Sequence, residues 1–529
     1  IMKNLFTDVL IVGAGPTGLF LSNILASFNI KNVLIEKNKS TVKEPRAVSI
    51  DDESLRVIQS LGVINKFLNK ISINYGSYYI SPNGKNFAVI EPTSKTYGFH
   101  KRNSFDQPDL EDLLLKNLIT KYKSNVFFNT EFLNFSQKQD YVCSNIITDK
   151  KKFQITSKYV VGCDGANSTI RKLLNIKLIG SSFKENWLIV DLFNSNNKFR
   201  HTQVFCDAKR PCITLPGPRG IRRYEFKLDQ SESKKDCYKS DFIKKLLYAK
   251  GESNNSIIRR KCIYTFNALI ANSWYNKRIL LAGDSAHQTP PFAGQGMNSG
   301  VRDALNLGWK LAFAIINCNS KILKTYEQER KNHISEMIKI SLLMGSILAP
   351  KNKILGFLTR LLFYIISYYK PAKDYVTQMK FKPKPSLNDG FLWRTYKNEE
   401  NQLIGQLFPQ PIVDDFKGNQ YLLDDILGND FCIIIYASSP ENFISDKLIK
   451  KFKTKNINIV GITPEWINPI KTNFNIVRDS SKTLSNKQYN NCLNKAFFIR
   501  PDKYIATITK AQNFESIYYL IDEFKIKLD

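Results

Sequence analysis

The sequence is poor in the residues that build metal and disulfide sites. Its 529 residues include four histidines and nine cysteines, and no two cysteines have Cys-X-X-Cys spacing. Paired-cysteine zinc sites and dithiol redox motifs are therefore excluded, and no metal is expected. Free cysteines are typical of a reducing compartment, so we expect the protein in the cytoplasm.

The chain also lacks an apolar run long enough to cross a bilayer. The longest candidate, Ile354–Tyr369, is too short and is interrupted by Arg360. It is typical either of a helix on a membrane surface or of an apolar helix packed between domains, and we favour the second. No apolar signal region precedes Asp8, where a strand is expected, which also favours the cytoplasm.

Acidic residues are fewer than basic ones, 47 against 77, and the net charge is +30. The lysines are spread along the whole chain, and the densest run, 447–455, surrounds apolar residues as in a solvated helix. We therefore expect no nucleic-acid partner. The length and the 43% hydrophobic content predict two or three globular domains.

The first motif is a G-x-G-x-x-G turn at 13–18, between an apolar strand at 8–12 and a helical apolar pattern at 19–28. A second strand then ends at Glu36, which is placed to accept bonds from ribose hydroxyls. The glycines allow a tight turn, close approach of the backbone to a pyrophosphate, and packing of helix on strand. This predicts a dinucleotide fold for FAD or NAD, with binding residues Gly13, Gly15, Pro16, Thr17, Gly18, Glu36 and Lys37.

The second motif, ILLAGDSAHQTPPFAGQGMNSG at 279–300, follows another apolar strand. Gly283 permits a turn with the Asp284 carboxylate at its tip, where hydroxyl donors are its natural partners. Further glycines leave main-chain N–H groups uncovered where an amphipathic helix begins, and such a helix start attracts negative charge. The predicted binding residues are Gly283, Asp284, Pro291, Gly294, Gly296, Met297 and Asn298.

This second motif resembles a fingerprint of the FAD-dependent aromatic-ring hydroxylases, typified by p-hydroxybenzoate hydroxylase. The resemblance implies that Asp284 binds the ribityl chain of FAD and that 291–298 lies against the isoalloxazine ring. Asp164, in the sequence CDGANSTIR, resembles the family's DG motif near FAD and the NAD(P)H groove. Arg46 and Gln107 match positions that meet the FAD phosphates and the flavin chain.

Between these motifs, alternating patterns predict strands at 187–193, 201–206, 213–215, 222–228 and 263–266. The stretch 205–228 resembles the 3-(3-hydroxyphenyl)propionate hydroxylases. This implies a phenolic acid as substrate, and the candidate substrate contacts are Arg222, Arg223 and Tyr224.

The expected fold class is α/β with three parts. A Rossmann-type FAD-binding domain spans 1–180 and 270–345, and a mixed β-sheet for the substrate spans 181–269 with part of 72–107. A helical connection at 346–395 leads to a thioredoxin-like domain without CxxC at 396–529, expected to serve in docking or in a homodimer.

The resemblance implies an enzyme that binds FAD non-covalently, consumes NADH or NADPH and O₂, and hydroxylates a phenol through a flavin C4a-hydroperoxide. A second G-x-G-x-x-G is absent, which fits a nicotinamide that binds only transiently. Three alternatives stay open. One is a flavin-dependent epoxidase or halogenase, which shares the first elements of the fold, although the sequence has no W-x-W-x-I-P stretch typical of a halogenase. The others are a polyprenyl-phenol hydroxylase of quinone synthesis, suggested by 354–369, and a flavin-binding protein without turnover.

Overall fold

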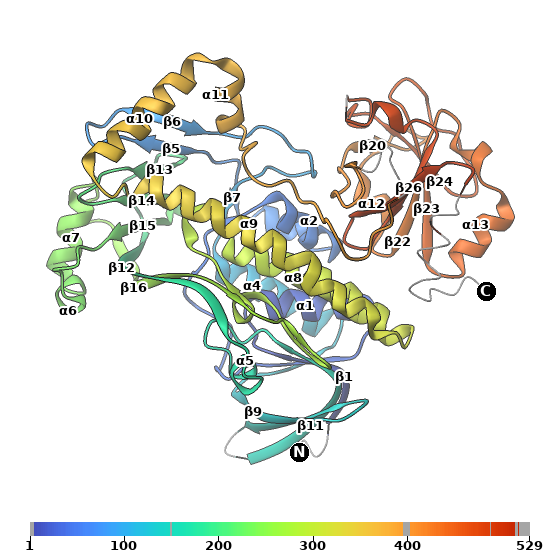
Figure 1. The fold of residues 1–529 in the computed structure, drawn as a ribbon, viewed down its shortest axis with the longest axis horizontal. Helices are drawn as coiled ribbons and strands as arrows, with labels where there is room; N and C mark the ends of the chain where they lie inside the picture. The colour runs from blue at the N-terminus through green and yellow to red at the C-terminus, as the bar shows by residue number, and fades with distance from the viewer. Residues whose placement is uncertain (1–4, 149–150, 395–401, 487, 514–516, 518–529) are drawn as a thin grey trace.

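The computed structural model describes residues 5–148, 151–394, 402–486, 488–513 and 517. Three lobes are visible in Figure 1: an α/β lobe that contains the first strand, a β-rich lobe beside it, and a C-terminal α/β lobe. The predicted α/β fold class is confirmed. We propose that the three lobes are the domains whose boundaries are predicted from the sequence.

The first lobe is built on a parallel sheet with strand order β17-β18-β11-β1-β2-β8. The strands from β18 to β8 on this path are parallel to one another, whereas β17 pairs antiparallel with β18 and β10 (Val142–Thr148) pairs antiparallel with β11. Both sequence motifs therefore follow strands whose carboxyl ends share one edge of the sheet, the carboxyl edge, where such folds bind ligands. The strand bounds are β1 Leu5–Val12, β2 Asn32–Ile35, β8 Asn125–Phe127, β11 Lys151–Gly162, β17 Tyr275–Asn276 and β18 Ile279–Leu281.

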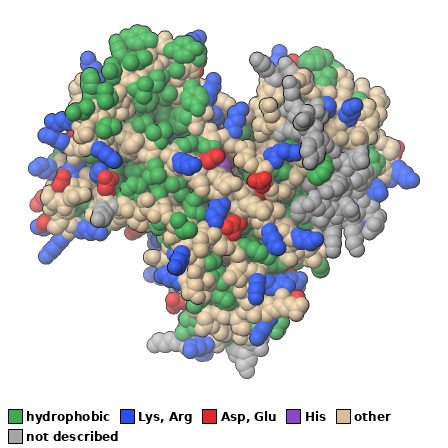
Figure 2. Space-filling model, viewed as in Figure 1, with side chains coloured by type: hydrophobic (Ala, Val, Ile, Leu, Met, Phe, Trp, Pro, Cys, Tyr) green, Lys and Arg blue, Asp and Glu red, His purple; other side chains and the backbone are tan. Residues whose placement is uncertain are grey.

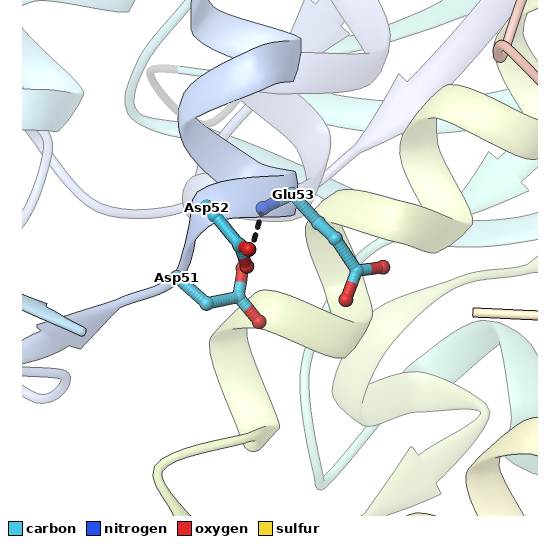
Figure 3. A group of neighbouring side chains, drawn as sticks. All are labelled: Asp51, Asp52 and Glu53. Carbon is cyan, nitrogen blue, oxygen red and sulfur yellow. Dashed lines mark hydrogen bonds between the residues drawn. The ribbon is translucent and has the colours of Figure 1, made fainter. Parts of the chain in front are cut away.

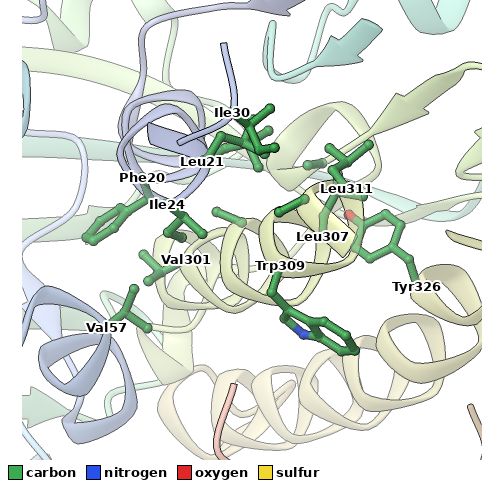
Figure 4. Packing of buried hydrophobic residues seen from close by; sticks show 14 of the residues in the cluster. Phe20, Leu21, Ile24, Ile30, Val57, Val301, Leu307, Trp309, Leu311 and Tyr326 are labelled. Atoms are coloured by element: carbon green, nitrogen blue, oxygen red, sulfur yellow. The ribbon is translucent and has the colours of Figure 1, made fainter. Parts of the chain in front are cut away.

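Helices α1 (Pro16–Ser27) and α8 (Gly296–Ile316) pack against each other through apolar side chains (Figure 4). A Cβ at Gly308 would lie only 2.6 Å from Cγ2 of Ile24, so the two helices approach closely where they cross. α4 (Gln107–Thr120) packs beside α1. β10 pairs antiparallel with β11, and β9 (Thr130–Gln137) pairs antiparallel with β10, so the three strands form a meander.

The β-rich lobe is an eight-stranded sheet in the order β19-β16-β12-β15-β14-β13-β5-β6. Its long strands β12 and β16 pair from Leu178 opposite Ala271 to Phe193 opposite Ile257, so they connect the two lobes. The strand bounds are β5 Ser77–Ile80, β6 Asn86–Ile90, β12 Leu178–Phe193, β13 Thr202–Phe205, β14 Cys212–Pro216, β15 Arg222–Lys227, β16 Ile257–Ala271 and β19 His287–Gln288.

One face of this sheet is covered by α7 (Ser240–Tyr248), which contributes Ile243 and Leu247 to a shared apolar cluster. The opposite face meets the end of the long helix α9 (Lys324–Leu348). A small sheet lies between the lobes, with the strand order β3 (Ser49–Ile50), β7 (Asn103–Ser104) and β4 (Ser72–Ile73). Its strand β3 comes directly before helix α2 (Asp52–Ser60).

Helices α10 (Lys353–Tyr368) and α11 (Lys370–Thr377) lie on β6, at the outer edge of the molecule (Figure 1). In α10 only Gly356 is buried, and most of its apolar side chains are exposed. The favoured interpretation of 354–369 as a helix packed between domains is therefore wrong. Among the described residues, no helix has the length and apolar character needed to span a membrane.

The C-terminal lobe has the sheet order β21-β20-β24-β23-β22-β25-β26. β22 is parallel to β23 and antiparallel to β25, as expected for a thioredoxin-like core. The predicted final helix lies outside the described residues. The strand bounds are β20 Ile412–Asp414, β21 Gln420–Leu422, β22 Phe431–Tyr436, β23 Ile457–Thr463, β24 Asn475–Asp479, β25 Lys495–Ile499 and β26 Ile505–Lys510, with α12 at Leu423–Leu427 and α13 at Asp446–Lys453.

A buried ion network joins this lobe to α8 and α9. Arg500 donates to both oxygens of Glu329, at 2.9 and 2.7 Å, and Lys310 donates to Glu329 Oε2 at 2.6 Å. Trp309 Nε1 donates to Asp502 Oδ2 at 2.9 Å. These side chains are almost completely removed from solvent, so the C-terminal lobe is firmly attached to the helix that leaves the second motif.

Candidate active site

The three glycines of the first motif have different surroundings. Gly13 has φ +108°, and a Cβ there would lie 2.3 Å from the carbonyl oxygen of Cys163. At Gly18 a Cβ would lie 1.9 Å from the carbonyl oxygen of Gly13. A Cβ at Gly15 would have no heavy atom of the described residues, apart from its chain neighbours, within 4 Å. The turn is therefore tightly packed on two sides and open above the start of α1, as a bound pyrophosphate requires.

Glu36 lies at the end of β2, beside this turn. Its Oε2 accepts a bond from the Ala14 amide at 2.9 Å, and its Oε1 accepts from the backbone and side chain of Asn38 at 2.9 and 2.6 Å. These bonds hold the carboxylate next to the glycines, the place where a dinucleotide ribose lies in this fold. The next residue, Lys37, is exposed.

Arg46 is exposed, and its guanidinium makes no ion pair within the described ranges. Its backbone is fixed instead: Gln107 Oε1 accepts from the amides of Arg46 and Ala47 at 3.0 and 2.7 Å. Gln107 Nε2 donates to Glu111 Oε1 at 2.7 Å. Gln107 thus holds the loop that carries Arg46, and its predicted contact with the flavin chain stays a prediction. Burial raises the pKa of Glu111 to about 7.

The second motif is held against the first by Thr17. A Cβ at Gly283 would lie 2.5 Å from Thr17 Oγ1, and a Cβ at Gly300 would lie 2.3 Å from it. Glycine is therefore needed at both positions for close packing. Asp284 follows with an exposed side chain and has no hydrogen-bond partner in the part of the chain that the structure describes. The surrounding protein reduces its hydration and raises its pKa, while His287 and Arg46 act in the opposite direction.

Helix α8 begins directly after the loop that contains Pro291, Gly294 and Gly296. Gly294 has φ +64°, and the first intrahelical bond here is from the Ser299 amide to the Gln295 carbonyl at 2.9 Å. The amides of Gly296, Met297 and Asn298 thus form the free first turn of the helix. Such a turn stabilises a ligand that becomes anionic.

The Asn298 side chain fixes this loop to the small sheet. Its Nδ2 donates to the carbonyls of Gly294 and Ser49 at 2.7 and 3.2 Å, and its Oδ1 accepts from the Asp51 amide at 3.1 Å. The predicted contact of residue 298 with a flavin therefore concerns its backbone N–H, because the side chain is already engaged.

Asp164 comes directly after β11 on the same edge. Its Oδ2 accepts from the amides of Thr169 and Ile170 at 2.7 and 3.2 Å, while its buried Oδ1 has no hydrogen-bond partner among the residues that the structure describes. Arg171 bridges the two loops by donating to the carbonyls of Ser285 and Ala166 at 2.9 and 2.8 Å. The DG segment is thus held against the Asp284 turn.

A buried charge network behind the Asp284 turn escaped the sequence analysis. His287 Nε2 lies 2.6 Å from Asp303 Oδ2, which also accepts from the Gly283 amide at 3.1 Å, and Arg330 Nε donates to Asp303 Oδ1 at 2.8 Å. Burial alone would raise the pKa of Asp303, but His287 and Arg330 hold it well below its usual range. The network fixes Gly283 and hence the direction of Asp284. The pairings join residues far apart in the sequence, so no local pattern indicated them.

A second network, shown in Figure 3, includes Asp51, Asp52 and Glu53 at the start of α2. In the described part of the chain these are the three acidic residues close enough together to hold a metal ion. Arg302 of α8 forms ion pairs with Asp51 and Glu53, and Lys382 Nζ lies 3.2 Å from each of them. Because these cations already compensate the charge, we infer that the group connects α2 to α8. Burial raises the pKa of Asp52 to about 6.

The loop before α8 also forms part of an aromatic cluster. Phe292 contacts Trp187 and Phe266 of the β-rich lobe, with ring centroids 5.5 and 5.4 Å apart. Around them lie apolar side chains from β5, β13, β14 and α9, including Tyr79 and Leu348. We call Trp187, Phe266, Phe292, Tyr79 and Leu348 the aromatic cluster. It lies beside the loop before α8 that is predicted to contact the flavin.

The candidate substrate residues of β15 are engaged elsewhere. Tyr224 packs in the cluster under α7 and donates to Glu252 at 2.7 Å. Arg222 donates to Thr214 and to three backbone carbonyls. Arg223 pairs with Asp191 at 2.6 Å and donates to the carbonyls of Pro45 and Arg46. Four of the five N–H groups of each arginine are thus used, and Arg223 supports the loop that carries Arg46.

A different arginine, Arg102, lies at the border of the aromatic cluster. Its guanidinium lies 4.6 Å from the ring centroid of Tyr75 and donates to Ser77. Burial raises the pKa of Tyr79, and the charge of Arg102 acts in the opposite direction. The Tyr75 hydroxyl donates to Ser49 Oγ at 2.7 Å, and Ser49 lies against Gly294. Within the described residues Arg102 has no carboxylate partner. No sequence motif singled it out.

The cavity between α2, α8 and the C-terminal lobe is a separate feature. Ion-paired residues such as Arg302, Asp424 and Asp502 line it, and it contains none of the predicted flavin residues. The carboxyl edge, by contrast, combines an open glycine turn, an unpartnered carboxylate and a free helix start. These residues fit FAD: Gly15 and Arg46 would hold the pyrophosphate, Glu36 a ribose, Asp284 the ribityl hydroxyls, and the start of α8 the ring.

Comparison with known proteins agrees with this geometry. The family profile described as "FAD binding domain" matches residues 6–341, and one described as "HcaD C-terminal domain" matches 405–522. The chain is 33% identical over 462 residues to a 3-(3-hydroxy-phenyl)propionate/3-hydroxycinnamic acid hydroxylase of Escherichia coli strain SMS-3-5 / SECEC, covering 87% of this chain and 83% of that protein. A protein of the same name from Shigella sonnei strain Ss046 is 34% identical with the same coverage.

Among solved structures, the flavin-dependent monooxygenase PieE in complex with FAD and substrate has a TM-score of 0.78 at 16% identity, covering 99% of this chain and all of that one. The two proteins therefore share one fold over nearly all of this chain. With the family profile and the two relatives, this shows that the chain belongs to the family of FAD-dependent aromatic-ring hydroxylases.

Proposed function

We propose that the protein is an NADH- or NADPH-consuming monooxygenase that hydroxylates a phenolic acid of the 3-(3-hydroxyphenyl)propionate type. The observation that carries the proposal is the position of the aromatic cluster, which meets the loop of Pro291 and Gly294 through Phe292. A phenol ring held there lies beside the predicted flavin ring and away from water. The names of the relatives support the phenolic acid as substrate class.

FAD, when bound, supplies the redox and oxygen chemistry, with NAD(P)H as reductant and O₂ as the source of the oxygen atom. The residues of the chain supply the environment. The free amides at the start of α8 would stabilise negative charge on a bound flavin, and the apolar side chains would keep water from the substrate.

Arg102 is the best candidate for binding the substrate carboxylate. It is half-buried, has no carboxylate partner among the described residues, and lies between Tyr75 and Ser77 beside the aromatic cluster. A planar guanidinium binds a carboxylate through two parallel hydrogen bonds. Arg222 and Arg223, in contrast, already use most of their donors within the protein.

The test uses two phenols that differ only in the acid group. Replacing Arg102 by Met removes a charged interaction worth about 1.5–3 kcal/mol in total, so KM for 3-(3-hydroxyphenyl)propionate is expected to rise roughly 10- to 100-fold. KM for 3-ethylphenol, which lacks the carboxylate, is expected to stay within about threefold, because it never used these bonds. The readout is substrate-stimulated NAD(P)H oxidation.

A matched control comes from Arg360, another half-buried arginine without an ion pair in the described part of the chain. Arg360→Met is expected to leave both KM values near wild type. An equal loss on both phenols in Arg102→Met, or the acid-specific loss in Arg360→Met instead, would show that Arg102 does not bind the carboxylate.

The polyprenyl-phenol hydroxylase is retained as a second candidate because of one observation, the exposed apolar surface of α10. Turnover of a long-chain phenol only when it is presented in lipid vesicles would favour this candidate over the phenolic acid. All nine cysteines are free, which supports our proposal of a cytoplasmic location.

A further inference from the structure

Helix α10 presents its apolar side to solvent. Ile354, Phe357 and Tyr368 are 72, 57 and 74% exposed, and Leu358, Leu362 and Ile365 follow on the same side at i, i+4 and i+7. Figure 2 shows the result as a continuous hydrophobic area over α10 and α11. Single exposed apolar residues are ordinary, but a contiguous apolar surface marks a binding site.

The orientation of the helix is not accidental, because its inner side is anchored. Phe363 contacts Phe87 of β6 with ring centroids 5.7 Å apart, and Gly356 is the residue in α10 that is buried. Thr359 and Arg360 are partly covered on the inner side, while the leucines face outward. A helix of a water-exposed surface normally has the reverse arrangement.

The charges around this surface are basic. The segment 351–380 contains six lysine or arginine residues and one acidic residue, Asp374, which gives a net charge of +5. Exposed lysines lie at both ends of α10: Lys351, Lys353, Lys370 and Lys373. Tyr364, Tyr368 and Tyr369 add rings that are apolar with one polar atom, as is typical at a lipid interface.

We propose that α10, with the start of α11, is a docking surface for a bilayer that contains anionic lipids. The apolar side inserts at the boundary of headgroups and acyl chains, parallel to the membrane plane, and the flanking lysines contact lipid phosphates. A second copy of the chain fits this surface less well, because two-fold packing would bring the same lysines against each other. The proposal does not depend on the identity of the substrate.

The docked helix lies near the candidate substrate region. α10 packs on β6, next to β5, and β5 contributes Tyr79 to the aromatic cluster. Docking therefore places the β-rich lobe at the membrane surface.

The experiment is co-sedimentation of the full-length FAD-loaded protein with sucrose-filled vesicles. One set is phosphatidylcholine alone and the other contains about one third phosphatidylglycerol, at low and high salt. Binding is expected to the anionic vesicles and to weaken with salt, because screening removes the lysine contribution. No binding to the anionic vesicles at millimolar lipid would overturn the proposal.

Two sets of variants assign the binding to this surface. The triple variant Leu358→Glu, Leu362→Glu and Ile365→Glu is expected to lose at least tenfold in vesicle affinity, while Ile470→Glu, at an exposed apolar residue of the C-terminal lobe, is not. The double variant Lys353→Gln and Lys370→Gln is expected to lose about fivefold in affinity for anionic vesicles per lysine removed. The control double variant, Lys447→Gln and Lys450→Gln on α13, is expected to keep its affinity.

Thermal melting and bound FAD must match wild type in each variant, so that a folding defect is recognised. Equal losses in the control variants would overturn the assignment to α10. Sedimentation velocity supplies the remaining outcome: if the triple Glu variant changes a dimer into a monomer without changing vesicle binding, the surface joins two copies of the chain and the lipid proposal is wrong.

Discussion

The substitutions Gly15→Ala and Gly18→Ala are expected to affect the protein in different ways, although the two glycines are only three residues apart in the sequence. Gly15 has φ −74° and ψ −179°, which any residue adopts, and nothing lies within 4 Å of a Cβ there. Gly15→Ala is therefore expected to change the free energy of unfolding of the apo-protein by no more than about 0.5–1 kcal/mol, which is the usual range for a substitution at a helix start. At Gly18 the new Cβ would lie 1.9 Å from the Gly13 carbonyl oxygen. The backbone must therefore move, and we expect the free energy of unfolding to fall by about 3 kcal/mol or more.

FAD affinity is expected to show the opposite order among folded molecules. In Gly15→Ala the methyl group fills the space that the pyrophosphate needs, and one charged hydrogen bond of about 1.5–3 kcal/mol is lost. This corresponds to a roughly 10- to 100-fold higher Kd. The assays are urea unfolding of apo-protein and FAD titration by fluorescence quenching. Wild-type affinity in Gly15→Ala would refute the placement of the pyrophosphate over this turn.

Three further predictions follow from single contacts. Asp284→Ala is expected to raise the Kd for FAD roughly 10- to 100-fold and Asp284→Asn less, since Asn keeps one acceptor oxygen; lower apo stability with unchanged affinity would contradict a role at the ribityl chain. The pKa of Asp52 is raised to about 6, so the folded state binds its proton more tightly and stability falls as pH rises from about 4 to 6. Asp52→Asn should therefore be more stable than wild type by about 2 kcal/mol at pH 7.5 but not at pH 4 in urea unfolding, and equal curves would refute this. Arg500→Met leaves Glu329 with Lys310 as its remaining cation and should cost about 3–5 kcal/mol; a loss below about 1 kcal/mol would show that the network does not hold the C-terminal lobe.

The elements around the cofactor were predictable because their signals are local. The strand, glycine turn and helix at 8–28 follow from adjacent residues, and so does the helix start after Gly296. Pairings between distant residues gave no such signal. His287 with Asp303, and Arg302 with Glu53, become neighbours only when the lobes assemble. Their roles in holding the loops were therefore missed.

Two interpretations failed for a different reason. The alternation in β15 separated Tyr224 from Arg223 correctly but could not show that α7 covers the face with Tyr224. The apolar composition of 354–369 suggested burial, since apolar residues are usually inside. Composition does not reveal which side of a helix its neighbours cover, and in α10 they cover the side with Thr359 and Arg360.

The most direct test of the account is turnover of 3-(3-hydroxyphenyl)propionate by the FAD-loaded protein under ¹⁸O₂, followed by mass spectrometry. The account predicts that NADH or NADPH is oxidised faster when the acid is present, and that the product carries one added hydroxyl group labelled with ¹⁸O. If the nicotinamide is oxidised with no labelled hydroxylation of this acid or of any related phenolic acid, the central claim is wrong.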